Sequence, residues 1–447
     1  MLIEFAITNF RSIKERQVFS MLPSDRVRAD KRKNALLPIP SYKDLNLLTV
    51  AGIWGKNSAG KSNLVKAFQA MEWLVLQSQR FTRGDLLHAN EAFAFDVNFQ
   101  KEPTVFEIDF IAKDKKRYAY LIEFDKNKIF REELFYYVMS NTEKTTKRKL
   151  FVRRLGEAIS YGDDFKGFRK PIEERTLPNV LFLSKSVNEN STFLDPIFDF
   201  FKNDFTVSDF SDGYIDFQPR YFAKIANDNA SNDMDTLNRA LRDIDTGILA
   251  LVTNKSDKLP KNVIIEEESD GELDEEQQRQ RDILLDTLKT EIKAVHKLFD
   301  GKKEIGTHSL PLGEESEGTR KFIAVFAALM QKIQEGNLFV VDEFDKSFHP
   351  LLTKILISLL ANPKINVKGA QLIITTHDAD LMDSLDNDQI NIAQKDFTGA
   401  TEIYTVSDIR GLRGDVSIAK RYLRGELEGI PTINNISIHR SLELSYV

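Results

Sequence analysis

The chain of 447 residues is 42% apolar, enough to bury at least one full core, which indicates one large interrupted domain or two lobes. It contains no cysteine, which excludes disulfides, cysteine-ligated zinc and iron–sulfur clusters and fits a reducing cytoplasm. A net charge of −6 and a pI near 5.7 argue against a general nucleic-acid coat, which needs a positive face. No apolar run approaches the ~20 residues of a membrane span, and the first residues do not read as a signal peptide, so we expect a cytoplasmic protein without membrane contact.

The first part of the chain, residues 1–185, predicts a strand, a loop and a helix, followed by an antiparallel β-lobe. Apolar runs at 2–7 and 47–53 indicate strands, and the second run leads into a glycine-bounded loop. The helix after this loop has an apolar stripe made of Leu64, Phe68, Met71 and Val75. From about residue 91 the pattern changes to short alternating segments, such as 93–99 and 106–110, which indicate the β-lobe.

The middle of the chain, residues 186–304, is predicted to be a mostly helical insertion. An acidic segment at 266–272 predicts a solvated turn within it, and a charged helix is expected over about 275–299. Residues 305–447 return to buried α/β segments. We therefore expect one sheet assembled from both ends of the chain, with the middle inserted.

The segment 55–62, Gly-Lys-Asn-Ser-Ala-Gly-Lys-Ser, matches the Walker A pattern. Its glycines let backbone N–H groups wrap nucleotide phosphates at a helix N-terminus. Lys61 is expected to reach the β- and γ-phosphates and the Ser62 hydroxyl to bind Mg²⁺, so ATP and Mg²⁺ are the expected cofactors. The predicted nucleotide-binding residues of this region are Gly55, Lys56, Asn57, Ser58, Ala59, Gly60, Lys61, Ser62 and Asn63.

A buried run at 338–341 ends in Asp342 and Glu343, the form of a Walker B strand. Neighbouring residues of a strand point in different directions, so Asp342 can hold Mg²⁺ while Glu343 faces the water that attacks the γ-phosphate. Two acids also occur at ordinary strand exits, but the Walker A segment favours the catalytic interpretation. His377 follows another buried strand at 372–376. A lone histidine is usually structural, yet a place at the carboxyl edge of this sheet favours a γ-phosphate contact.

Ser316 precedes a predicted helix with an apolar stripe. Serine is a natural N-cap, and a cap serine close to Gly318 leaves backbone N–H groups free to bind an anion. The alternative is an ordinary capped helix. The sequence thus offers a second helix N-terminus suited to phosphate, far from the Walker A segment.

The order of these motifs resembles the ABC-type ATPases: Walker A, a long insertion, a Ser-x-Gly helix, Walker B and a histidine strand. It is most similar to their soluble branch of chromosome-maintenance, RecF-like and recombination-repair proteins, whose opening segment is similar to Asn-Phe-Arg-Ser at 9–12. Further stretches resemble a narrower bacterial family, at 315–319, 342–350, 371–378 and 388–390, and in the tail at 422–425 with 429–431. These are the stand-alone AAA-labelled ATPases of phage-defence and abortive-infection loci, of the RloA and PARIS type.

The resemblance implies an α/β fold, namely an ABC-type ATPase head with a mixed sheet, an antiparallel β-lobe and an inserted helical region. It places Asn9, Arg11 and Ser12 near the nucleotide. The signature Ser-Glu-Gly-Thr differs from the Ser-Gly-Gly-Gln of transporters, which argues against a membrane-transport ATPase. The residue that senses Mg²⁺ is expected at 182–188, with Asn188 as a substitute for the usual glutamine.

In such proteins ATP closes a head-to-head homodimer, alone or within a higher oligomer. Ser316, Gly318 and Thr319 of one subunit would contact the γ-phosphate held by the Walker A loop of the other. Ser347 would lie in the interface loop after Walker B.

Three functions are compatible with these features. The first is a defence ATPase that senses phage infection and controls a separately encoded effector, a nuclease or toxin. The second is a DNA-repair or replication ATPase that clamps DNA, and the third is a scaffold that binds ATP but hardly turns it over. Glu343 weighs against the third, and the acidic charge and lack of a long coiled coil weigh against the second. Nucleic acid is therefore not expected to be the primary partner.

Overall fold

The computed structural model describes residues 1–139, 145–167, 169–208, 233–244, 247–255, 289–346, 349–412, 416–427 and 429. The chain forms two compact units, Met1–Val207 with Lys332–Val447, and Ser208–Gln331. The first unit is therefore assembled from both ends of the chain, as predicted. The insertion spans 208–331 and not 186–304, because the short helices after residue 186 pack into the core of the first unit.

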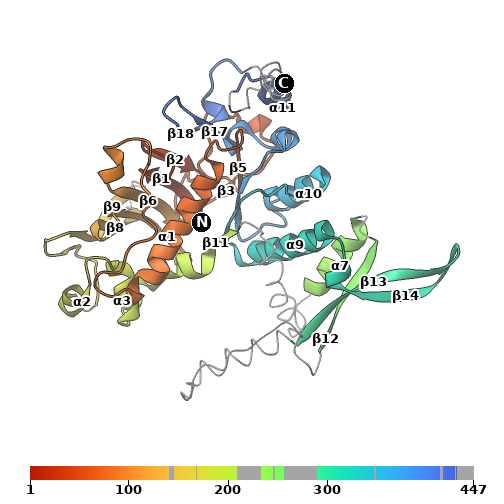
Figure 1. The fold of residues 1–447 in the computed structure, drawn as a ribbon, viewed down its shortest axis with the longest axis horizontal. Helices are drawn as coiled ribbons and strands as arrows, with labels where there is room; N and C mark the ends of the chain where they lie inside the picture. The colour runs from red at the N-terminus through yellow and green to blue at the C-terminus, as the bar shows by residue number, and fades with distance from the viewer. Residues whose placement is uncertain are drawn as a thin grey trace, which may run out of the picture. The chain divides into compact units, whose positions relative to one another are not determined.

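A six-stranded mixed sheet positions the predicted motifs (Figure 1). Its order is β11 (Phe205–Ser208), β15 (Leu338–Val341), β16 (Gln371–Thr375), β5 (Val50–Trp54), β17 (Ile390–Lys395) and β18 (Thr401–Thr405). Strands β15, β16, β5 and β17 run parallel, and β18 is antiparallel to β17. Every residue of β15, β16 and β5 is buried, as expected for central parallel strands.

A seven-stranded antiparallel sheet forms the β-lobe. Its order is β10 (Ser160–Tyr161), β9 (Thr145–Arg154), β8 (Ile129–Met139), β7 (Arg117–Phe124), β6 (Thr104–Ile111), β1 (Leu2–Thr8) and β2 (Gln17–Ser20). A separate two-stranded pair joins β3 (Leu37–Pro38) to β4 (Asn46–Leu47).

The strand predicted at 93–99 is wrong. These residues form turns that run into a short 3₁₀ helix at Phe99–Lys101. Of the apolar residues that suggested a buried face, Phe95 is 74% exposed and Val97 is 68% exposed. The Asn9 side chain instead ties this loop down through hydrogen bonds to its backbone.

Helix α1 (Lys61–Gln77) packs between the two sheets. The Phe68 ring stacks on Phe5 of β1 with centroids 4.3 Å apart, and it lies 5.7 Å from Phe205 of β11. The apolar stripe predicted for this helix is buried. The first unit also contains α2 (Lys170–Arg175), α3 (Phe182–Asn188), α4 (Asp195–Asp199), a π-helix (Phe200–Asp204), α10 (Pro350–Ala361) and α11 (Ile418–Leu423).

The second unit contains helix α7 (Asp233–Asp243) and a three-stranded antiparallel sheet. The strands are β12 (Ile248–Lys255), β13 (Thr290–Asp300) and β14 (Lys303–Pro311), in that order. The prediction of a mostly helical insertion is therefore wrong for these residues. Ile292 and Ala294 alternate with charged residues and are buried, which is the two-residue period of a strand. The predicted turn at 266–272 and the first part of the predicted charged helix lie outside the described residues.

Helix α9 (Glu317–Glu335) begins in the second unit, and its predicted apolar stripe is buried. In the part of the chain that the structure describes, no helix is both long and apolar enough to cross a membrane.

Candidate functional site

Three neighbouring parallel strands bring the predicted motifs to one edge of the mixed sheet. Strand β16 pairs with β15 on one side and with β5 on the other. The Walker A loop follows β5, the two acids follow β15, and His377 follows β16. Because the carboxyl ends of parallel strands meet at one edge, this order assembles the groups predicted for ATP hydrolysis.

The backbone of the Walker A loop is shaped to hold an anion. Ser58 and Gly60 have φ values of 63° and 106°, in the left-handed region that turns N–H groups inward. Among the described residues, the N–H groups of Asn57, Ser58, Gly60 and Lys61 donate no internal hydrogen bond. A side chain at Gly60 would collide with Thr401, whose Oγ1 would lie 2.1 Å from the added Cβ. The loop therefore offers free donors at the start of α1.

Lys61 closes this loop from inside. It is 6% exposed, and its ammonium donates to the carbonyl oxygens of Gly55 (2.8 Å) and Lys56 (3.3 Å). Burial lowers the pKa of Lys61, while the charges of Asp342, Asp345 and Glu343 act in the opposite direction. The carboxylates after β15 therefore stabilise the charged form of Lys61.

The two acids after β15 differ in environment. The Asp342 carboxylate accepts a hydrogen bond from the Thr375 hydroxyl. Glu343 has a φ of 49° and an exposed side chain, which lies 3.3 Å from the ammonium of Lys346. The sequence prediction missed Thr375, although it lies in the quoted stretch Ile-Thr-Thr-His.

His377 is exposed at the strand exit, and its backbone N–H donates to Asp345 at 3.3 Å. Although the residue keeps much of its accessible area, desolvation of the ring lowers its pKa, and the charge of Lys61 lowers it further. Three carboxylates, those of Asp345, Glu343 and Asp342, oppose this shift. The imidazole is therefore neutral at pH 7 and can donate one hydrogen bond and accept another.

Arg11 and Ser12 reach the Walker A region through a chain of hydrogen bonds. Arg11 Nε donates to Asn63 Oδ1 (2.8 Å), and Asn63 Nδ2 donates to Ser12 Oγ (2.6 Å). Ser12 Oγ lies 2.7 Å from Thr401 Oγ1, which in turn donates to the Ala59 carbonyl at 2.8 Å. Ser12 and Thr401 are buried behind the loop, so they support it. The sequence prediction missed Thr401, which lies in no recognised motif.

Asn9 does not face the nucleotide loop. It is 1% exposed, and its side-chain amide donates to the carbonyl oxygens of Phe99 and Glu102 at 2.8 and 2.7 Å. Its Oδ1 accepts from the Phe93 N–H. The nucleotide-binding role predicted for Asn9 is replaced by a structural one, because its hydrogen-bonding atoms are used to hold the 93–102 loop.

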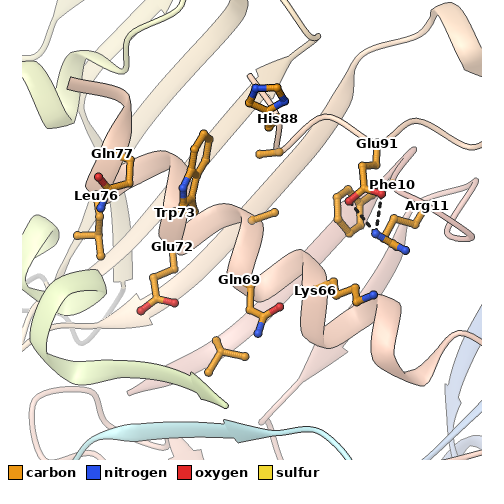
Figure 2. A pocket seen from close by; sticks show the side chains of 13 residues that line it. Phe10, Arg11, Lys66, Gln69, Glu72, Trp73, Leu76, Gln77, His88 and Glu91 are labelled. Carbon is orange, nitrogen blue, oxygen red and sulfur yellow. Dashed lines mark hydrogen bonds and ion pairs between the residues drawn. The ribbon is translucent and has the colours of Figure 1, made fainter. Parts of the chain in front are cut away.

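A groove of about 570 Å³ runs beside α1, starting near Arg11 (Figure 2). Arg11 and Glu91 point toward each other and form an ion pair of 2.5 Å at one end. Trp73 and Glu72, consecutive residues of α1, both line this groove. Burial raises the pKa of Glu72 to about 7, and the charge of Lys332 acts against this shift.

Ser316 caps α9, as the sequence predicts. Its Oγ accepts the N–H of Thr319 at 3.1 Å and lies 2.8 Å from Thr319 Oγ1. Ser316 is exposed, and Gly318 and Thr319 are half-buried. Ser347, predicted for the interface loop, lies outside the described residues.

The predicted Mg²⁺-sensing position at 182–188 is wrong. These residues form α3, where Ser184 Oγ donates to the Val75 carbonyl near the end of α1. Val75 lies 13 residues beyond Ser62, or ~20 Å along the helix. Asn188, at the end of α3, is therefore remote from the phosphate loop.

A protein-family model described as "AAA domain, putative AbiEii toxin, Type IV TA system" matches residues 50–383, which is more than half of the chain. The chain belongs to this AAA family. The matched range includes the Walker A loop, the insertion, Walker B and His377.

Among solved structures, this AAA-family chain is similar to the SMC head domain from Thermotoga maritima, with 14% identity over 90% of this chain and 98% of that chain, and a TM-score of 0.37. Two structures of the recombination mediator protein RecF in the RecFOR pathway are also similar, each with a TM-score of 0.34. The first is 12% identical and the match covers 90% of this chain and 98% of that chain. The second is 15% identical and the match covers 90% of this chain and 97% of that chain. None of the curated proteins compared matches the chain.

The residues of the AAA domain fit ATP with Mg²⁺. The unpaired N–H groups and Lys61 suit the phosphates, and the half-buried Ser62 hydroxyl lies in the first turn of α1. Within the described residues, Asp342 has one carboxylate oxygen bonded to Thr375 and the other free of hydrogen bonds. An oxygen donor set of this kind is what Mg²⁺ prefers.

Proposed function

We propose that this chain is a dimeric ATPase whose nucleotide state controls a separately encoded effector, a nuclease or toxin, in defence against phage. The observation that carries the proposal is the convergence of Lys61, Asp342, Glu343 and His377 at neighbouring strand ends. The words "toxin" and "TA system" in the family description support the defence setting.

Each group has a role in hydrolysis that follows from its chemistry. Lys61 and the loop N–H groups bind the β- and γ-phosphates, and Ser62 and Asp342 would hold Mg²⁺, which neutralises charge on the phosphates when bound. Glu343 orients the attacking water and takes its proton. His377, neutral at pH 7, donates a hydrogen bond toward the γ-phosphate.

The capped start of α9 supports a composite site. Ser316 is exposed and its Oγ accepts the Thr319 N–H, while among the described residues the N–H groups of Glu317 and Gly318 have no hydrogen-bond acceptor. The N-terminus of a helix binds anions, and the anion at the start of α9 would be the γ-phosphate of ATP held by the second subunit. ATP would then close the dimer, and hydrolysis would open it.

Phage plating on cells that carry the gene with its neighbours tests the proposed role. Protection is expected from the wild-type locus and is expected to be lost with Lys61→Ala or Glu343→Gln. Protection that survives Lys61→Ala would contradict an ATP-controlled defence role. Tight, salt-resistant DNA binding that strongly stimulates the ATPase would favour a DNA clamp instead.

A further inference from the structure

Thr375, the last residue of β16, is fully buried and forms hydrogen bonds with the loop that follows β15. Its hydroxyl donates to Asp342 Oδ1 and accepts the N–H of Glu343 at 2.8 Å. Its carbonyl oxygen accepts the N–H of Phe344 at 3.0 Å. One threonine therefore anchors three successive residues of the loop after β15.

The register of the sheet makes this arrangement possible. Val341 pairs with Ile374 in the parallel ladder, so Thr375 lies beside the first residue after β15. A hydroxyl has one proton and two lone pairs, so it can serve the carboxylate and the N–H at once. Valine has the same shape and can do neither, whereas serine can do both.

Glu343 depends on these contacts because its backbone is strained. A φ of 49° in a non-glycine residue persists only where the surroundings hold it. The N–H groups of Glu343 and Phe344 both donate to Thr375, on either side of the strained residue. The same hydroxyl thus fixes the rotamer of Asp342 and the direction in which Glu343 leaves the strand.

We infer that Thr375 is a positioning residue that couples the metal-binding carboxylate to the water-activating one. This inference rests on the proposed ATPase function of the site and assigns a role that the Walker motifs do not include. Thr375 touches neither phosphate nor water in this role. It acts through Asp342 and Glu343, so its loss affects the catalytic step and the Mg²⁺ requirement more than nucleotide binding.

The test compares Thr375→Val with Thr375→Ser. Steady-state ATPase is measured over a range of Mg²⁺ concentrations, and nucleotide affinity is measured separately by equilibrium binding without Mg²⁺. For Thr375→Val we expect a ~10–100-fold loss of kcat and a raised Mg²⁺ concentration at half-maximal rate, since a hydrogen bond to a charged group is lost. Nucleotide affinity without Mg²⁺ should change by less than ~3-fold, and Thr375→Ser should restore most of the rate.

Thr376→Val is the matched control. Thr376 is also fully buried, but among the described residues its hydroxyl accepts only the Asp378 N–H, at 3.0 Å, and it has no hydrogen bond to either acid. A purely structural role for buried threonines at this strand end predicts equal losses in both valine variants. If Thr375→Val does not fold, Thr375→Ala is measured in its place.

Three results overturn the inference while leaving the ATPase function intact. The first is wild-type turnover and Mg²⁺ dependence in Thr375→Val. The second is an equal loss in Thr375→Ser and Thr375→Val, and the third is an equal loss in Thr376→Val and Thr375→Val. A wild-type chain that binds ATP but does not hydrolyse it contradicts the proposed function itself, and the inference then falls with it. The wild-type rate therefore separates the two failures.

Discussion

Glu343 combines a strained backbone with an exposed side chain. Its only ion pair among the described residues joins it to Lys346 at 3.3 Å, with side-chain exposures of 49% and 67%. Exposed pairs of this kind contribute about 0–1 kcal/mol, so the carboxylate can leave Lys346 at little cost. The strain is therefore compatible with a group that must turn toward a bound nucleotide.

Replacement of Glu343 by glutamine tests its role as general base. ATP binding should be retained, and hydrolysis should slow by ~10²-fold or more, because typical general-base contributions are about 10²–10⁴. Single-turnover ATPase and equilibrium binding measure the two effects. Lys346→Ala is the control and should change the rate by less than ~3-fold. Unchanged turnover in Glu343→Gln would assign water activation to another group, with His377 the next candidate.

Glu72 on the groove side of α1 predicts a pH effect on stability. Its pKa is raised from 4.5 in the unfolded chain to about 7 by burial, so the folded state holds the proton more tightly. The contribution of Glu72 to the stability of the protein is therefore most favourable below pH 4.5, and it becomes less favourable as pH rises toward 7. Glu72→Gln removes this loss and should stabilise the protein by about 2 kcal/mol more at pH 8 than at pH 5, after allowance for partial exposure.

Urea unfolding of wild type and Glu72→Gln at the two pH values measures this difference. Equal stabilisation at pH 5 and pH 8 would mean that glutamine acts through packing, and the titration argument would then fail.

At the scale of single residues, the sequence predicts the groups whose chemistry has a fixed spacing. Asp342 and His377 lie at the exits of β15 and β16, and Lys61 begins α1 after the loop that follows β5, where the pattern places them. Thr375 and Thr401 could not be predicted in this way. Threonine is an ordinary strand residue, and the partners of its hydroxyl depend on the register between strands far apart in the chain.

At the scale of elements, the start of β18 supports the Walker A loop from behind. Thr401 Oγ1 donates to the Ala59 carbonyl and contacts Ser12, and it fills the space that a side chain at Gly60 would need. Thr401→Val should leave that carbonyl without its donor. We expect ATP affinity to fall ~5–30-fold, in line with about 1–2 kcal/mol for a buried hydrogen bond, while kcat at saturating ATP changes by less than ~3-fold.

Thr405→Val on the same strand is the matched control. Its hydroxyl donates to Asn391 at 3.0 Å, and within the part of the chain that the structure describes it has no hydrogen bond to the loop. An equal loss of ATP affinity in the two variants would indicate a general defect of β18. A large fall in kcat with unchanged affinity would place Thr401 in the catalytic step and not in loop support.

Two elements were assigned wrongly from the sequence for the same reason. In each, contacts with residues distant in the chain override the structure that the local sequence pattern favours. Residues 93–99 alternate like a strand, but Asn9 binds their backbone and leaves Phe95 exposed. Residues 290–299 carry enough charge to read as a surface helix, yet Ile292 and Ala294 pair into a sheet with β12. In both cases the decisive contact comes from another part of the chain.

At the scale of the whole molecule, the proposed composite site draws on motifs that lie far apart in the chain. Lys61 and Glu343 belong to the first unit, and Ser316 belongs to the second. Ser316 could contact the nucleotide of its own chain or the nucleotide of a partner chain. These two arrangements predict different ATPase rates when two defective variants are mixed.

Ser316→Arg and Lys61→Ala should each be inactive alone, because every site of either homodimer contains one lesion. In a mixed dimer, one composite site combines both lesions and the other has both elements intact, so about half the wild-type rate per dimer is the ceiling. If subunits exchange freely, about half of the dimers are mixed, and the expected recovery is about a quarter of the wild-type rate. An arrangement within one chain predicts no recovery, because each chain keeps its own lesion. The ATPase rate of the mixture decides between the two, with exchange verified by differently tagged chains; a rate equal to the sum of the two variants despite verified exchange would exclude the composite site.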